Sequence, residues 1–587
     1  MKLSDYVIDF LVKEGVGCVF EFIGGAITHM ADSMYGRSDI ACVAVHHEQA
    51  AAFAAEAYAR SSGSLGVAMA TSGPGALNLL TGIGSCYFDS VPCLFITGQV
   101  NTYEYKFDRP LRQLGFQETD IVSVVKPLTK YAEMVVDPTA IRYHLEKAVY
   151  LARSGRPGPV LLDLPMNVQR AGIEPEKLAG FCESEEFQGR QAQPLKSVDF
   201  AGIIRLLANA KRPVVLAGGG VRTSGACEEL QRFLQKTGLP VVTSLMGLDA
   251  VPHDSPNFLG MIGAYGNRYS NLALANADFL LILGSRLDTR QTGTRPESFA
   301  RGAVKVQVDI DPHELDAKVK TDIAVNCDLR QFVLELNRRL RSFNKPDLRD
   351  WYALIQDYKE RFPCAPVSEE TRINPNRMME ILSRHCRPGD IICLDVGQNQ
   401  MWAAQSFKLK TGQRMLISGG MGAMGFALPA ALGAAKTGRR VIVISGDGGI
   451  QVNSQELDTL VQHNLSVKVF VMNNSCLGMV RQFQDMYFEG RWQATVIGYN
   501  CPDLVKLASA YGVAGTYRID TPAGAEEIIA RAMADPGPAF IEVRLEQTSW
   551  VNPKLTVNHP IEDMSPHLDR EELQKLMLID LMDSVPD

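Results

Sequence analysis

Short apolar runs alternate with helical stretches along most of this chain. The runs that predict strands are residues 66–71, 92–97 and 159–163, then 213–217, 240–243, 279–283 and 304–309, and finally 391–395, 440–445, 467–472 and 539–543. Strands that alternate with helices are typical of parallel sheets with helices on their faces. The pattern therefore predicts an α/β protein built from doubly wound parallel sheets.

The predicted elements fall into three blocks, which we interpret as three domains. With 587 residues the chain is too long for one hydrophobic core. Weak periodicity marks two linkers, 169–197 and 344–371, and a tail, 548–587, that we interpret as a lid or packing arm. The domains themselves are then residues 1–168, 198–343 and 372–547.

Composition and charge exclude several classes of protein. Hydrophobic residues make up 46% and charged residues 21% of the chain, which is typical of a globular protein. A net charge of -7 argues against a nucleic-acid partner, which requires a basic face. No apolar run reaches the roughly 18 residues of a membrane helix, and the N-terminus lacks the core of a signal peptide. The 12 cysteines form no C-x-x-C pair, so we expect reduced thiols in a cytoplasmic protein.

The first and third domains share a pattern. The Ala-rich helix 50–60 precedes the strand 66–71 and then Ser-Gly-Pro-Gly at 72–75. The Ala-rich helix 424–435 precedes the strand 440–444 and then Ser-Gly-Asp-Gly at 445–448. Either this order arises by chance, as it can in any α/β protein, or a duplicated domain holds opposite ends of one ligand.

Polar residues at the ends of two strands predict a metal–phosphate clamp. Gly446-Asp447-Gly448 follows one strand, and Asn473-Asn474 follows the next, after a crossover helix at about 454–463. Open α/β sheets bind ligands at the carboxyl ends of adjacent strands, and Mg²⁺ prefers oxygen ligands such as a carboxylate and an amide. Each segment alone is an ordinary turn. Together they resemble the thiamine-diphosphate motif, which implies that Asp447, Asn474 and the backbone carbonyl of Cys476 bind Mg²⁺.

Glu48 is a candidate for the carboxylate that this cofactor requires. It follows an apolar strand and lies in the first turn of the Ala-rich helix. A carboxylate against the aminopyrimidine ring promotes the imino form that removes the thiazolium proton. The alternative is an acidic residue that stabilises the N-terminus of its helix.

Eight further segments extend the resemblance: 47–50, 70–78, 89–92, 96–100, 115–120, 156–160, 395–402 and 418–425. With them the chain resembles the acetolactate synthase family over nearly its whole length. In that family different subunits hold the two ends of the cofactor, which implies at least a homodimer.

The resemblance also implies roles for individual residues. Glu48 becomes the activating acid, Met424 supports the bent cofactor, and the backbone of Gly422 accepts a hydrogen bond from the ring amine. Phe116 and Gln117 are implied at the catalytic centre. The remaining residues implied around the cofactor are Gly397, Gln398, Asn399, Gly446, Gly448, Gly478 and Met479.

The middle domain has the features of a nucleotide site. A strand runs into Gly218-Gly219-Gly220, which is a weak signature by itself. With residues 284–293 and 308–312 it resembles the flavin-binding parts of the same family, so we expect bound FAD. Arg286 and Arg290 are candidates for the diphosphate, and Asp309 or Asp311 for the adenosine end. The alternative is an empty nucleotide fold; in this family the flavin has no net redox role.

Several positions depart from the biosynthetic members of the family. Met166 stands where lysine is usual, Phe483 where tryptophan is usual, and Ile23 where proline is usual. Residues 475–478 are Ser-Cys-Leu-Gly rather than Glu-x-Gln-Gly. The resemblance implies that these positions line the substrate funnel or lie near the cofactor, so their replacement affects which acceptor fits.

The resemblance implies a carboligase. Pyruvate loses CO₂, and its two-carbon unit is joined to a ketone acceptor, with acetolactate as the product when the acceptor is a second pyruvate. The substitutions at the predicted substrate funnel, and residues 111–113 just before the segment 115–120, point to a second candidate acceptor, a nucleotide-linked 4-keto deoxysugar. A flavin-dependent pyruvate oxidase is a third alternative, and a catalytically inactive partner subunit leaves Glu48, Asp447 and Asn474 unexplained.

Overall fold

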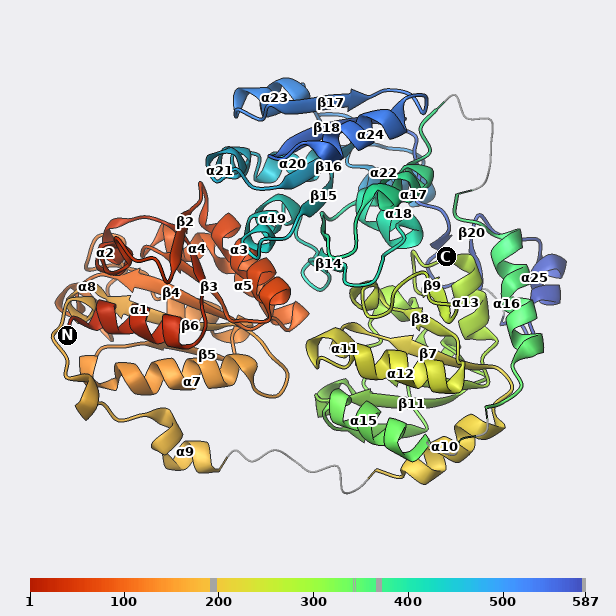
Figure 1. The fold of residues 1–587 in the computed structure, drawn as a ribbon, viewed down its shortest axis with the longest axis horizontal. Coiled ribbons are helices and arrows are strands. Elements are labelled where there is room, and N and C mark those ends of the chain that lie inside the picture. Colours follow the sequence, from red (N-terminus) through yellow and green to blue (C-terminus); the bar gives the residue numbers. More distant parts are fainter. Residues whose placement is uncertain (190–197, 341–342, 344, 366–371, 583–587) are drawn as a thin grey trace.

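The computed structural model describes residues 1–189, 198–340, 343, 345–365 and 372–582; the remaining parts of the predicted linkers and tail lie outside the described residues. Three lobes follow one another along the chain, from red through green to blue (Figure 1). Each contains one six-stranded sheet in which every strand pair is parallel. The α/β class with three parallel sheets is confirmed.

The first sheet has the strand order β2-β1-β3-β4-β6-β5. Its strands are β1 (Cys18–Phe22), β2 (Ala41–Ala44), β3 (Gly66–Ala70), β4 (Cys93–Gln99), β5 (Tyr131–Met134) and β6 (Val160–Pro165). Its main helices are α1 (Leu3–Lys13), α2 (Thr28–Met34), α3 (Glu48–Ser62), α4 (Pro74–Asn78), α5 (Leu80–Asp89), α6 (Ile121–Val125), α7 (Ile141–Arg153) and α8 (Met166–Gln169).

The third sheet repeats this topology, with the order β14-β13-β15-β16-β18-β17. Counted from one within each sheet, both orders read 2-1-3-4-6-5, which supports a duplicated domain over a chance similarity. The strands are β13 (Ile391–Leu394), β14 (Arg414–Ile417), β15 (Val441–Gly446), β16 (Val467–Asn473), β17 (Gly515–Ile519) and β18 (Ala539–Arg544). The helices are α17 (Pro375–His385), α18 (Gln398–Ser406), α19 (Ala427–Ala435), α20 (Asp447–Val452), α21 (Glu456–Gln462), α22 (Gly478–Tyr487), α23 (Leu504–Ala510) and α24 (Ala525–Ala534).

The central sheet has a different order, β12-β11-β10-β7-β8-β9. Read from β9, it is 3-2-1-4-5-6, the order of dinucleotide-binding folds. The strands are β7 (Pro213–Ala217), β8 (Val241–Thr243), β9 (Phe258–Met261), β10 (Phe279–Leu283), β11 (Val304–Asp309) and β12 (Ile323–Asn326). The helices include α10 (Phe200–Asn209), α11 (Gly219–Thr223), α12 (Cys227–Thr237), α13 (Arg268–Ala275), α14 (Thr289–Thr292), α15 (Leu329–Arg339) and α16 (Arg349–Arg361).

Helices α3 and α19 join the first and third domains, as their neighbouring positions in Figure 1 show. Both are Ala-rich and buried along nearly their whole length, so their backbones approach closely. A Cβ at Gly433 would lie 1.8 Å from the backbone oxygen of Ala54. Phe53 and Phe426 meet edge to face at 5.3 Å. Buried residues of both domains therefore form one continuous core.

The predicted helix at 424–435 begins too early and is corrected to α19, which starts at Ala427. Gly422 and Gly425 adopt φ values of +65° and +82°, which end any helical conformation before that point. Met424 therefore lies in an irregular loop, 418–426, that connects β14 to α19.

The tail packs as a small hairpin and a helix, β19 (Lys554–Leu555), β20 (Met564–Ser565) and α25 (Arg570–Leu576). Within the described residues, every helix is too short or too polar to cross a lipid bilayer.

Candidate functional site

Asp447 and Asn474 stand beside each other because their strands are neighbours. β15 and β16 pair in parallel, with Gly446 opposite Met472, so the residues that follow both strands meet at one sheet edge. Asp447 begins α20, and Asn474 follows β16 directly. The side chains are only 2% and 4% exposed.

The environment of Asp447 suits a bound cation. Burial raises the pKa of this carboxyl to about 6, and the hydroxyl of Tyr499 donates to its Oδ2 at 2.7 Å. A buried carboxylate without a strong positive neighbour favours a metal ion that would restore its charged form. Tyr499 carries no signal in the sequence that ties it to this site.

The other two predicted ligands are also arranged to offer oxygen. Asn474 donates its Nδ2 to Gln398 Oε1 at 2.8 Å, which leaves its amide oxygen as the group available to a metal. Burial raises the pKa of the Cys476 thiol to about 12, so the thiol stays protonated and the backbone carbonyl is the suitable ligand. Three oxygen donors of this kind fit Mg²⁺.

Glycines allow close contacts around the Gly-Asp-Gly turn. A Cβ at Gly478 would lie 2.0 Å from Gln398 Oε1, and one at Gly397 would lie 2.6 Å from Asn399 Oδ1. Asn399 donates to the backbone oxygens of Asp395 and Ile444, which ties the ends of β13 and β15 together. The turn is thus lined by backbone groups that diphosphate oxygens can approach.

Asp395 holds the loop that carries Gly422 and Met424. Its carboxylate accepts from the backbone N–H groups of Val396, Gly425 and Ala427 at 2.8, 2.9 and 3.2 Å. Burial raises the pKa of this carboxyl to about 6, although these donors favour its ionised form. Met424 reaches the turn, because its Cε lies 3.2 Å from the position of a Cβ on Gly448. Met479, at the start of α22, lies partly buried at the same edge.

Glu48 lies at the N-terminus of α3 and is 6% exposed. Among the described residues its carboxylate has one hydrogen bond, which it accepts from Asn78 Nδ2 at 2.9 Å. A Cβ at Gly75 would lie 3.1 Å from Glu48 Oε1, so this glycine leaves room beside the acid.

Gln117 and Phe116 belong to the same end of the first sheet. A Cβ at Gly73 would lie 3.0 Å from the backbone oxygen of Gln117. Phe116 is 86% exposed and lies on the surface of the chain. Gln117 and Glu48 thus lie beside Gly73 and Gly75 of the same turn, whereas the hydrogen bond of Glu48 does not reach Asp447 or Asn474.

The flanking residues of Glu48 do contact the third domain. Asn453 donates to Gln49 Oε1 at 3.0 Å, and Glu456 accepts from the backbone N–H of His46 at 3.0 Å. These bonds anchor the start of α3 against the segment that follows the Gly-Asp-Gly turn.

A cavity of about 790 Å³ lies where the three domains meet. It opens at the ends of β7 and β10, the point at which the central strand order reverses and such folds bind ligands. A Cβ at Gly218 would lie 2.2 Å from Gly284 O, so only glycine allows the two turns to cross.

The predicted nucleotide residues divide into two groups at this cavity. Gly219, Gly220, Arg286, Arg290 and Asp309 line it. Asp311 instead pairs with Arg156 at 3.1 Å, and Arg156 is itself part of the lining. Burial raises the pKa of the Asp309 carboxyl.

Comparisons with known proteins agree with this arrangement. Models for the N-terminal TPP-binding, central and C-terminal TPP-binding domains of thiamine pyrophosphate enzymes match residues 1–124, 200–336 and 395–543. The acetolactate synthase large subunit of Lactococcus lactis is 36% identical over 96% of this chain and 95% of its own length. A probable acetolactate synthase large subunit of Methanocaldococcus jannaschii is 38% identical, over 93% and 92%. The chloroplastic acetolactate synthase 2 of maize is 37% identical, over 96% and 88%.

The chain belongs to the acetolactate synthase family of thiamine pyrophosphate enzymes.

The structure shows where the residues that differ from the usual family residues at the predicted substrate funnel lie. Phe483 is 42% exposed on α22, and its ring lies 4.7 Å from that of Tyr487. The ammonium of Lys554 lies 5.3 Å from the centre of the Phe483 ring, so the tail contacts this position directly. Ile23 is half exposed, and Met166 begins α8 at the end of β6.

Proposed function

We propose that this enzyme decarboxylates pyruvate and joins the two-carbon unit to a second pyruvate, which gives acetolactate. The observation that carries the proposal is the pairing of Asp447 with Asn474 at adjacent strand ends, beside a loop fixed by Asp395. Relatives of this length and identity carry the name acetolactate synthase.

Thiamine diphosphate, when bound, supplies the electron sink for decarboxylation and carboligation. Asp447, Asn474 and the Cys476 carbonyl would hold Mg²⁺ against the diphosphate. Met424 would support the bent form of the cofactor, and the Gly422 carbonyl would accept from its ring amine. Glu48 would hold a proton at the pyrimidine ring, with its orientation maintained by Asn78.

We further propose that FAD occupies the cavity of about 790 Å³. Arg286 and Arg290 provide two cations for a diphosphate, and the buried Asp309 provides an acceptor for the adenosine end. The 3-2-1-4-5-6 strand order supports a dinucleotide ligand.

A homodimer is the proposed minimal assembly. Glu48 bonds only within its own domain among the described residues, so another subunit can supply the diphosphate end that faces it. Large apolar side chains in the two domains that form the proposed cofactor site are exposed in the single chain, including Phe116, Val480 and Ile497. A cytoplasmic location stays a prediction, since the maize relative is chloroplastic by name.

The test is acetolactate formation from pyruvate alone, with thiamine diphosphate and Mg²⁺, followed by mass spectrometry. We expect acetolactate as the main product, and we expect Glu48→Gln to abolish turnover in a protein that stays folded. Glu176→Gln, on an exposed turn, is the matched control.

CO₂ release without acetolactate would indicate that the enzyme uses another acceptor, and keto sugars would be tested next. Full activity in Glu48→Gln would refute the role of this acid, and flavin reduction during turnover would indicate an oxidase.

A further inference from the structure

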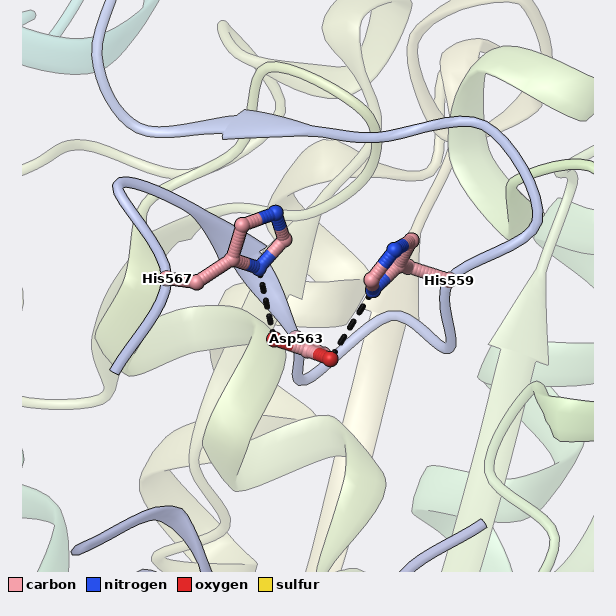
Figure 2. Close-up of side chains that lie close together, drawn as sticks. All are labelled: His559, Asp563 and His567. Atoms are coloured by element: carbon pink, nitrogen blue, oxygen red, sulfur yellow. Dashed lines mark hydrogen bonds and ion pairs between the residues drawn. The ribbon is translucent and has the colours of Figure 1, made fainter. Parts of the chain in front are cut away.

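Three side chains of the tail converge outside the proposed cofactor sites. His559 and Asp563 lie between β19 and β20, His567 follows β20, and the two histidines flank Asp563 (Figure 2). Each ring nitrogen Nδ1 faces one carboxylate oxygen, at 2.9 Å for His559 and 2.8 Å for His567. Within the described part of the chain, no other three His, Cys, Asp or Glu side chains converge in this way.

The spacing of these atoms is close to that of a metal coordination sphere. Two ligands of a tetrahedral zinc ion, each about 2.1 Å from it, are about 3.4 Å apart. The nitrogen–oxygen distances here are 2.8 and 2.9 Å, and all three ligand atoms lie within 4.8 Å of one another. Small side-chain rotations would therefore bring both imidazoles and the carboxylate onto one ion.

A second contact fixes one of the rings. Thr556 Oγ1 lies 2.9 Å from Nε2 of His567, on the side of the ring away from Asp563. Metal-binding histidines commonly donate their other ring N–H to such an oxygen, which orients the ring and sets its tautomer. A metal at Nδ1 would move the proton of the neutral ring to Nε2, where Thr556 accepts it.

The segment that carries the ligands is held in place from outside. Arg268 on α13 donates to the backbone oxygens of Met564 and Pro566 at 3.2 and 2.6 Å. The backbone N–H of Asn558 donates to Thr294 Oγ1 at 2.8 Å. The side chain of Asp563 is 9% exposed, so its carboxylate is shielded from solvent and needs its charge balanced by neighbours.

We propose that His559, Asp563 and His567 bind one divalent transition-metal ion of the zinc class. Two imidazoles and one carboxylate favour zinc and its neighbours over Mg²⁺, which prefers oxygen ligands. The ion joins three residues within the tail, which Arg268 and Thr294 hold against the central domain, and is separate from the Mg²⁺ proposed at Asp447. Arg570, 3.8 Å from Asp563 Oδ2, is the cation that it partly displaces.

The test is a Zn²⁺ titration of the full-length protein, loaded with thiamine diphosphate and excess Mg²⁺, against a chromophoric chelator. We expect one tight equivalent per chain that Mg²⁺ does not displace. His559→Gln and His567→Gln should each weaken binding by roughly tenfold or more. His313→Gln, an exposed histidine on the central domain, is the matched control and should bind as the wild type does.

Thermal unfolding gives a readout that does not depend on the chelator. Zn²⁺ should raise the midpoint of the wild type and of the His313 variant, but not of the two triad variants. Circular dichroism of the metal-free variants checks that they fold. The absence of a tight equivalent in the wild type, or equal binding in the triad variants, would overturn the proposal.

Discussion

Removal of the Tyr499 hydroxyl tests how the protein prepares Asp447 for its metal. Tyr499→Phe deletes a hydrogen bond of 2.7 Å to a carboxylate that is 2% exposed. Hydrogen bonds to charged groups contribute about 1.5–3 kcal/mol, which corresponds to roughly 10- to 150-fold in binding. The bond is present without the metal and acts on Mg²⁺ binding by lowering the pKa of Asp447, so we expect the Mg²⁺ concentration for half-maximal activation to rise by about this factor at pH values below that pKa, and by less above it. Gln451, the other partner of the hydroxyl at 3.3 Å, keeps its bond to the Asp447 carbonyl.

A pH profile separates this effect from a loss of packing. The pKa of Asp447 is raised to about 6 by burial and is lowered by Tyr499, so the variant should have a still higher value. Because Mg²⁺ binds the ionised form, binding should weaken as the pH falls through this pKa, and should do so at higher pH in the variant. Tyr517→Phe is the control, since Tyr517 donates to Asp535 at 2.9 Å in the same domain. Unchanged Mg²⁺ activation with an unchanged pH profile would refute the reasoning.

Three further predictions concern the cores and the cavity. Gly433→Ala places a Cβ 1.8 Å from Ala54 O, so urea unfolding should show a loss of stability of about 3 kcal/mol or more. Gly172→Ala is the control and should leave stability unchanged, because a Cβ there meets open space. Burial raises the pKa of Asp163 to about 7, so the folded protein keeps a proton on this carboxyl that the unfolded chain loses above about pH 4. The free energy of unfolding should therefore fall by roughly 4 kcal/mol as the pH rises from about 4 to about 7, and Asp163→Asn should flatten this part of a stability–pH curve. Gly220→Val, whose Cβ would lie 2.7 Å from Gly284 Cα, should lower the flavin absorbance per chain of purified protein, and full flavin content would contradict the FAD proposal.

The strands that the sequence predicts are largely those buried on both faces. β7, β10 and β16 are buried at every position, so they appear as continuous apolar runs. The strands β1, β5, β9, β12, β14 and β17 are not predicted, and all of these except β1 are edge strands. β5 is partly exposed throughout and β12 is mostly exposed, so their patterns resemble those of loops.

The candidate residues were predictable where they follow a buried strand. Asp447, Asn474 and Gly218 follow strands of this kind, and chain order alone places them at a sheet edge. Tyr499 was not predictable, because it reaches Asp447 from a segment without regular structure. The triad of His559, Asp563 and His567 was missed for the same reason, since its convergence depends on the fold of the tail.

Close packing of the two Ala-rich helices explains how the duplicated domains form one unit. Alanine and glycine on α3 and α19 remove the side chains that normally separate two helices, so the backbone of Ala54 meets that of Gly433. Glu48 lies at one end of this pair, and the loop with Met424 leads into the other helix. A larger residue in this contact would shift both groups at once. The small residues of these helices therefore serve the geometry of the proposed cofactor site as well as the stability of the fold.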